Sequence, residues 1–402
     1  MTSIHVAERV RRIKPSPSSS AADRANQLKR EGRSIVSLVV GEPDFDTPAH
    51  IREAAAKAMN AGATRYTALP GTVELRQAIA AKLKRENGLD YDITEIIVGN
   101  GAKSVIYTAL AATLEPGDEV IVPAPYWVSY PDMVLACDGT PVAVACTEDE
   151  GFKLTAQKLE SAITPKTRWL ILNSPSNPTG ATYSIEAYKA LAAVLARHPH
   201  VLVMTDDIYE HIRFEGGTAP HLLNAAPELR ERTLAVNGVS KTYAMTGFRI
   251  GWAAGPRELI RALDTLTSQS AGNSCSVSQA AAAAALNGDQ SFVAESLATY
   301  RERRDAIAAG INAIPGLSCR LPEGAFYLFV NCAGLIGKRT PDGKVLATDN
   351  DVVLYLLERV GVAVVAGTAY GLSPYFRLSI ATSIEILNDG LARIAKAVGD
   401  LA

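Results

Sequence analysis

The chain has 402 residues, of which 48% are apolar and 20% are charged, and its formal net charge is -2 at pH 7. This composition is typical of a globular protein and excludes a disordered chain. The balanced charge gives no electrostatic reason to expect nucleic acid or an anionic membrane as a partner. The length suits two domains, or one large domain with a smaller one.

The cysteines and histidines indicate neither disulfides nor a metal site. The five cysteines form no CxxC pair, and the histidines show neither HExxH nor a His/Cys cluster at metal-ligand spacing. The basic N-terminus lacks the apolar stretch of a secretory signal, and no apolar run reaches the ~18 residues of a membrane span. We therefore expect reduced thiols, no metal, and a cytoplasmic protein without a membrane partner.

Helix-like and strand-like segments alternate from Ile51 onward. Apolar residues at helical spacing, followed by glycine, predict helices over 51–62 and 72–87, and a further helix over 184–198 lies among the strands. Strands that alternate with helices predict an α/β fold with a mainly parallel sheet covered on both faces. The predicted strands span residues 95–100, 118–125, 140–146, 167–175, 201–207, 233–240 and 249–256.

The pattern changes after about residue 290, where helices and strands no longer alternate regularly. A helix over 296–314 leads to strand-like segments at 324–331, 362–367 and 375–381, with a helix at 351–361 and another at the C-terminus. This order predicts a smaller α+β domain. The first 48 residues are expected to pack with it, because short terminal segments seldom fold alone. We therefore expect a large domain at 49–290 and a small domain formed by 1–48 and 291–402.

Distinctive polar or aromatic groups follow the predicted strands where each one ends. In an open α/β sheet, ligands bind outside the carboxyl ends of the strands. The strand at 95–100 runs into GNGAKS and a helix, whose free amides suit an anion. The other groups at this edge are Trp127, Asn177, Asp206, Tyr209, Ser240 and Lys241. Each has an ordinary structural explanation, as a tight turn, a turn former, a core aromatic or a loop lysine.

Together these groups indicate one ligand with four features. It would carry an anionic group at a helix N-terminus, a flat ring against Trp127, a basic ring atom facing a carboxylate, and an electrophilic carbon within reach of an amine. Pyridoxal 5'-phosphate has all four features. In such a site Lys241 forms the Schiff base, and Asp206 holds the ring-nitrogen proton so that the ring withdraws electrons.

The chain resembles the fold-type I pyridoxal-phosphate aminotransferases, specifically the bacterial aspartate aminotransferase branch of class I. The resemblance covers nearly the whole chain, and its motifs stand in the family's order. They are VGEPDFDTP, YTALPGTVELRQAIA, VGNGAKS, PAPYWVSYPDM, NSPSNPTG, DDIYEH, SKTYAMTGFRIGW, GAFYLFV and YFRLSIATS. The family's fold is a large domain with a mainly parallel sheet flanked by helices, plus a smaller α+β domain.

The resemblance implies a role for each site residue. Lys241 is the catalytic lysine, Asp206 pairs with the ring nitrogen, Asn177 and Tyr209 bind the ring hydroxyl, and Trp127 stacks on the ring. The phosphate is bound by Arg249, by the amides of Gly101, Ala102 and Lys103, and by the nearby Ser240. Tyr66 reaches the phosphate of the neighbouring subunit, which implies a homodimer with shared active sites. The substrate is held by Arg377 at its α-carboxylate, by the Gly41 backbone, and by Lys103, Trp127 and Asn177.

The expected reaction is transfer of an amino group from an L-amino acid to a 2-oxo acid in a ping-pong cycle. Lys103 in the GNGAKS turn is expected to bind a distal carboxylate, which favours aspartate and glutamate; its alternative is a phosphate neighbour without substrate contact. Gly238 and the segment 16–24 depart from the branch's usual residues. Aromatic, neutral or prephenate-type substrates therefore stay open. A β-lyase or decarboxylase shares the same core, and a non-catalytic sensor domain would need a helix-turn-helix extension.

Overall fold

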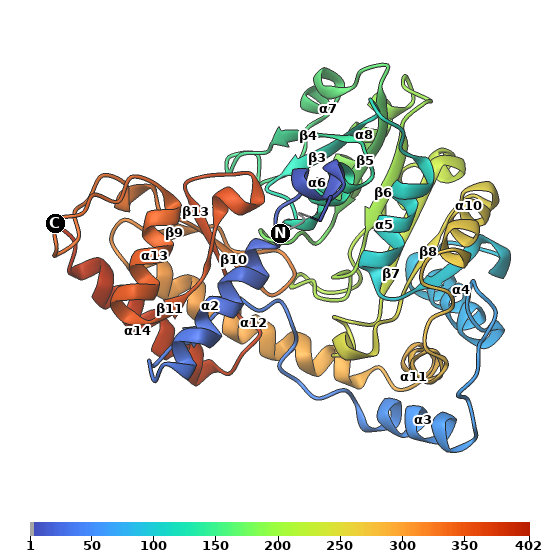
Figure 1. Ribbon diagram of the computed structural model, residues 1–402, viewed down its shortest axis with the longest axis horizontal. Coiled ribbons are helices and arrows are strands. Elements are labelled where there is room, and N and C mark those ends of the chain that lie inside the picture. The colour runs from blue at the N-terminus through green and yellow to red at the C-terminus, as the bar shows by residue number, and fades with distance from the viewer. Residues whose placement is uncertain (1–3) are drawn as a thin grey trace.

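A seven-stranded sheet forms the centre of the larger part of the protein (Figure 1). The computed structural model describes residues 4–402. The strand order is β2-β8-β7-β6-β5-β3-β4, and β8 alone runs antiparallel to its neighbours. All seven predicted strands lie in this sheet, which confirms the α/β class and the mainly parallel arrangement. Their bounds are β2 Ile96–Gly99, β3 Glu119–Ala124, β4 Thr140–Ala145, β5 Thr167–Asn173, β6 Leu202–Asp206, β7 Thr233–Gly238 and β8 Gly251–Ala254.

Successive side chains of a strand point to opposite faces of the sheet, and in these strands the side chains on both faces are apolar. Helices therefore cover both faces. Ile97 points into the cluster that contains Ile106 and Ile260, whereas Ile96 packs with Leu75 and Leu191 on the other face. The first face carries α5 (Ala102–Thr113), α6 (Ser129–Ala136) and α10 (Arg257–Ser268). The second carries α4 (Val73–Asn87), α7 (Ala156–Ala162), α8 (Ile185–Leu195), α9 (Leu222–Ala225) and α11 (Ser276–Asn287), with α3 (Ala49–Asn60) packed on α11.

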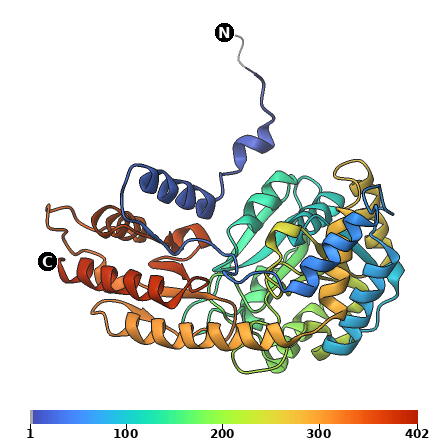
Figure 2. The same cartoon turned by 90° about the horizontal axis from the view of Figure 1, so that it is seen from below.

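The smaller part of the protein has its own sheets and its own apolar core. An antiparallel sheet has the order β12-β13-β10-β9, and a parallel pair joins β1 to β11. The long helix α12 (Ser291–Asn312) runs from the larger part along this core (Figure 2). The other elements are β1 Val36–Ser37, β9 Ser318–Cys319, β10 Tyr327–Asn331, α13 Asp349–Val360, β11 Val362–Ala363, β12 Val365–Ala366, β13 Tyr375–Ser379 and α14 Ile384–Gly399.

Two short helices precede β1 and touch different parts of the molecule. Helix α1 (Glu8–Arg12) lies against α6, where Arg12 and Arg9 both pair with Asp138. Helix α2 (Pro17–Arg30) packs on β11 and β12, with Ala25 and Leu28 buried. The chain between these helices therefore passes from the larger part to the smaller one. Among residues 4–402, no helix is both long and apolar enough to cross a bilayer.

Candidate active site

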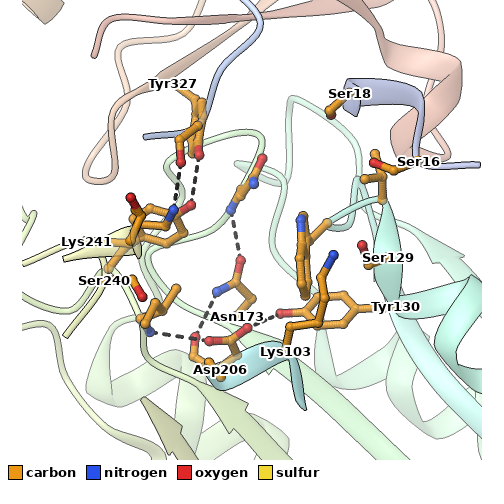
Figure 3. A pocket seen from close by; sticks show the side chains of 18 of the residues that line it. Ser16, Ser18, Lys103, Ser129, Tyr130, Asn173, Asp206, Ser240, Lys241 and Tyr327 are labelled. Carbon is orange, nitrogen blue, oxygen red and sulfur yellow. Dashed lines mark hydrogen bonds between the residues drawn. The ribbon is translucent and has the colours of Figure 1, made fainter. Parts of the chain in front are cut away.

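A cavity of ≈ 330 Å³ opens at the carboxyl ends of the parallel strands, between the two parts of the protein (Figure 3). A predicted site residue or turn follows each parallel strand that borders this cavity. The structure brings together eleven of the predicted site residues, which are Gly41, Ala102, Lys103, Trp127, Asn177, Asp206, Tyr209, Ser240, Lys241, Arg249 and Arg377.

Lys241 follows β7 and lines this cavity. Its Nζ donates a hydrogen bond of 2.7 Å to the carbonyl of Gly41, which belongs to the loop that enters the site after β1. Burial lowers the pKa of Lys241 from 10.5 to about 8, and the positive charges of Arg249 and Arg377 act in the same direction, against the opposing charges of Glu42 and Asp206. A fraction of the amine is therefore unprotonated near pH 7, and only the unprotonated form can act as a nucleophile or a base.

Asp206 ends β6 at the floor of the cavity and is 4% exposed. Its Oδ2 accepts a 2.6 Å hydrogen bond from the Tyr130 hydroxyl, and its backbone carbonyl accepts from Asn173 Nδ2 at 2.8 Å. Burial raises the pKa of Asp206 to about 6, although the hydrogen bond from Tyr130 opposes this rise. The group is thus largely a carboxylate at neutral pH and faces the cavity as an acceptor for a protonated ring nitrogen.

The turn before α5 forms a cradle for an anion. Gly101 has a positive φ of 84°, and a Cβ there would lie 2.7 Å from Arg249 Nη2. A Cβ at Gly251 would lie 2.2 Å from the amide nitrogen of Ala102, so β8 passes directly beneath this turn. Only glycine allows both approaches. The guanidinium of Arg249 and the first amides of a 12-residue helix therefore converge on one spot, which suits a phosphate.

Arg377 lies on β13 and is 2% exposed. Its Nη1 donates to Asn177 Oδ1 at 3.0 Å, and its Nη2 donates to the carbonyl of Val39. Its guanidinium carbon lies 4.5 Å from the ring centroid of Tyr327 and 5.3 Å from that of Tyr370. Its buried Nε has no hydrogen-bond partner within residues 4–402. Arg377 lines the cavity, and a buried guanidinium at a cavity wall is suited to a carboxylate ligand.

The remaining predicted residues complete the walls, with two exceptions. The Tyr209 hydroxyl lies 2.8 Å from that of Tyr327, and Lys103 Nζ lies 4.8 Å above the Trp127 ring. Burial, followed by the charge of Arg249, lowers the pKa of Lys103. Gly101 belongs to the turn before α5 but does not itself line the cavity. Tyr66 is 97% exposed and lies outside this cavity.

Several lining residues were not anticipated from the sequence. Asn173 holds the backbones of Asp206 and Asn177 through its amide, and Tyr327 meets Tyr209 from the small sheet. Their motifs, NSPSNPTG and GAFYLFV, were recognised, but each residue lies within a predicted strand, and nothing in the sequence distinguishes it as a site residue. The other unanticipated residues are Val128, Ser129, Tyr130, Ile208 and Thr246, whereas Ser16, Ser18 and Ser19 belong to the segment 16–24 that the sequence had singled out.

A second cluster of charged groups lies outside the lining of this cavity. Ligand atoms of Glu86, Glu210 and His211 lie within 4.8 Å of one another, as metal ligands do. The Lys82 ammonium group, however, pairs with Glu210 and lies 3.5 Å from Glu86, so a side-chain cation already occupies this place. Glu210 also accepts from Asn237 Nδ2 at 2.6 Å.

Comparison with known proteins identifies the family. The sequence model of the class I and II aminotransferases matches residues 33–394. The chain belongs to this family. It is 54% identical over 396 residues to an aspartate aminotransferase of Rhizobium meliloti, with 98% of this chain and 97% of the relative covered. It is 51% identical over 394 residues to a probable aspartate/prephenate aminotransferase of Rhizobium leguminosarum, with 98% of each covered. A crystal structure of the Rhizobium meliloti aspartate aminotransferase has a TM-score of 0.97 at 53% identity and full coverage of both chains.

This aminotransferase therefore moves an amino group between an amino acid and a 2-oxo acid, and it uses pyridoxal 5'-phosphate. The site fits that cofactor on its own chemistry. The glycine-lined turn beside Arg249 suits the phosphate, the buried carboxylate of Asp206 suits the ring nitrogen, and the partly neutral amine of Lys241 suits the aldehyde.

Proposed function

We propose that this aminotransferase acts on dicarboxylic substrates, L-aspartate and L-glutamate with their 2-oxo acids. The observation that carries this proposal is the pair of cations at the cavity, Arg377 from the small sheet and Lys103 from α5. Arg377, a buried guanidinium that lines the cavity, binds the α-carboxylate. Lys103, whose ammonium group lies over Trp127, binds the distal carboxylate.

The cofactor contacts follow from the same geometry. Asp206 holds the ring nitrogen, Trp127 stacks on the ring, and Asn177 and Tyr209 donate to the ring hydroxyl. The phosphate is held by Arg249, Ser240 and the amides of Gly101, Ala102 and Lys103. When bound, pyridoxal phosphate supplies an aldehyde that takes up the amino group and a ring that withdraws electrons from the α-carbon.

Lys241 performs the proton transfers. Its pKa of about 8 leaves a neutral fraction at physiological pH, so Nζ would accept the α-proton of the bound amino acid and would then hold it as the proton donor for the later part of the cycle. Gly41 and Arg377 orient the substrate so that this proton faces Nζ, which lies 2.7 Å from the Gly41 carbonyl before substrate enters. Tyr327 packs against the loop at Gly41, since a Cβ at Gly41 would lie 2.2 Å from the Tyr327 hydroxyl.

A prephenate-type substrate is the second candidate. Relatives at about half identity carry the name aspartate/prephenate aminotransferase. An open cavity of ≈ 410 Å³ adjoins the site and shares Ser16, Lys103, Val128, Ser129 and Arg249 with it. This room beyond Lys103 favours an acceptor that carries a ring between its two carboxylates.

The assembly and organisation that we propose are a cytoplasmic homodimer of two-domain subunits. Tyr66 is 97% exposed, yet it is a large aromatic side chain in a segment that resembles the family's phosphate-binding tyrosine. In a dimer it would reach the partner's phosphate site. The large domain comprises 49–290, and the small domain comprises 1–48 and 291–402, with helix α1 of this N-terminal segment reaching across to α6 of the large domain. Residues 1–3 lie outside the described residues.

The experiment that tests the substrate class compares amino donors with wild type and Lys103→Met. We expect wild type to prefer aspartate and glutamate over alanine and phenylalanine, measured as kcat/KM with 2-oxoglutarate as the acceptor, or with oxaloacetate when glutamate is the donor. Lys103→Met should lower kcat/KM for aspartate at least tenfold and leave phenylalanine within about threefold, because only aspartate has a distal carboxylate. An equal loss for both donors would assign Lys103 to the cofactor rather than to the substrate.

A further inference from the structure

Tyr130 touches both side chains that we assign to the cofactor ring. It lies in the first turn of α6, is 2% exposed, and lines the cavity. Its hydroxyl donates to Asp206 Oδ2 at 2.6 Å (Figure 3). Its ring meets the Trp127 ring edge-on, with 5.2 Å between centroids and an interplanar angle of 87°. One buried side chain thus contacts the carboxylate and the indole at the same time.

We propose that Tyr130 is a positioning residue for the cofactor, which aims the Asp206 carboxylate at the ring nitrogen and holds the Trp127 indole in its stacking plane. This inference rests on the proposed roles of Asp206 and Trp127. The carboxylate torsion of aspartate is intrinsically broad, so a carboxylate that must meet one ring atom needs a fixed partner. The amide of Ile208 reaches Oδ1 only at 3.4 Å, which leaves Tyr130 as the short contact. An edge-on ring likewise restricts rotation of the indole.

The hydroxyl of Tyr130 also acts on the charge of Asp206. Burial raises the pKa of this carboxyl, and the charge of Asp207 adds to the rise. The hydrogen bond from Tyr130 and the charge of Lys241 lower it, and Tyr209 is the further titratable group that faces it. Loss of the hydroxyl therefore raises the pKa of Asp206. A carboxyl group that has become neutral no longer pairs with a protonated ring nitrogen.

The test is the dissociation constant of pyridoxal phosphate from the apoprotein, followed by quenching of tryptophan fluorescence from about pH 5 to about pH 8. Tyr130→Phe should weaken binding about tenfold at neutral pH, because one hydrogen bond to a charged group is lost. The pH below which binding fails should move upward in this variant. Tyr130→Leu should bind more weakly still, because the contact with Trp127 is lost too. Tyr188→Phe, which removes another fully buried hydroxyl, is the matched control and should change neither quantity.

Two further comparisons separate this inference from the proposed site. Asp206→Asn should weaken binding more than Tyr130→Phe does, because it removes the charge itself. If Asp206→Asn binds as wild type does, the cofactor assignment of Asp206 is wrong and the inference falls with it. If Asp206→Asn binds weakly but Tyr130→Phe keeps the affinity and pH midpoint of wild type, Tyr130 has no positioning role. Equal losses in Tyr130→Phe and Tyr188→Phe would likewise overturn it.

Discussion

Replacing Lys241 by methionine should make the apoprotein more stable while abolishing its chemistry. Burial lowers the pKa of Lys241 from 10.5 to about 8. A folded-state pKa below the unfolded value means that the charged lysine opposes folding, fully below pH 8 and progressively less as the pH rises from 8 to 10.5. The difference between the two pKa values corresponds to about 3 kcal/mol. The lost hydrogen bond to Gly41 offsets about 1 kcal/mol of this.

We therefore expect Lys241→Met to gain about 2 kcal/mol at pH 7 in urea unfolding of the cofactor-free protein. The gain should shrink toward zero by about pH 10, because wild type then loses its buried charge. Lys84→Met is the control: its side chain is 69% exposed, so its free energy of unfolding should stay within about 0.5 kcal/mol of wild type. A Lys241→Met protein that is no more stable than wild type at pH 7, or whose gain is independent of pH, would refute the argument.

Three other changes test separate parts of the account. Arg377→Lys keeps the charge but loses the planar fork, so kcat/KM for aspartate should fall about 50-fold; a loss below fivefold would contradict the clamp. Gly251→Ala places a Cβ 2.2 Å from the backbone at the start of α5 and should cost about 1–3 kcal/mol and weaken cofactor binding, whereas Gly247→Ala meets nothing within 4 Å and should do neither. Glu210→Gln leaves the buried Lys82 with only the more distant Glu86 carboxylate, 3.5 Å away, and should cost about 3 kcal/mol in thermal unfolding; Lys82→Met combined with Glu210→Gln should recover part of this, and no recovery would contradict the pairing.

The larger sheet was predictable because its strands are short apolar runs separated by helices. Its edge was predictable too, since a parallel sheet places Trp127, Asp206 and Lys241 at the same side once the strands are known. Pairing between strands that lie far apart in the sequence was harder to predict. The predicted strand at 362–367 divides into β11, which pairs with β1, and β12, which pairs with β13, because these partners come from opposite ends of the chain.

The residues that the sequence did not reveal are those whose role depends on a partner far along the chain. Tyr130 has the pattern of a core helix residue, and only the folded arrangement brings its hydroxyl to Asp206, 76 residues away. Tyr327 sits in an apolar strand and meets Tyr209 across 118 residues. Helix α12 begins at Ser291, five residues before the predicted start, and only three residues separate it from the end of α11 at Asn287. Periodicity identifies such elements but not their contacts.

The most direct test of the central claim is the visible absorption of the purified protein on addition of L-aspartate without any 2-oxo acid. We expect the band of the bound cofactor to disappear, because Lys241 and the substrate clamp complete the first half of the reaction alone. The band should return when 2-oxoglutarate is added. A band that aspartate leaves unchanged would contradict the proposed substrate class, and would leave the fold and the cofactor in place.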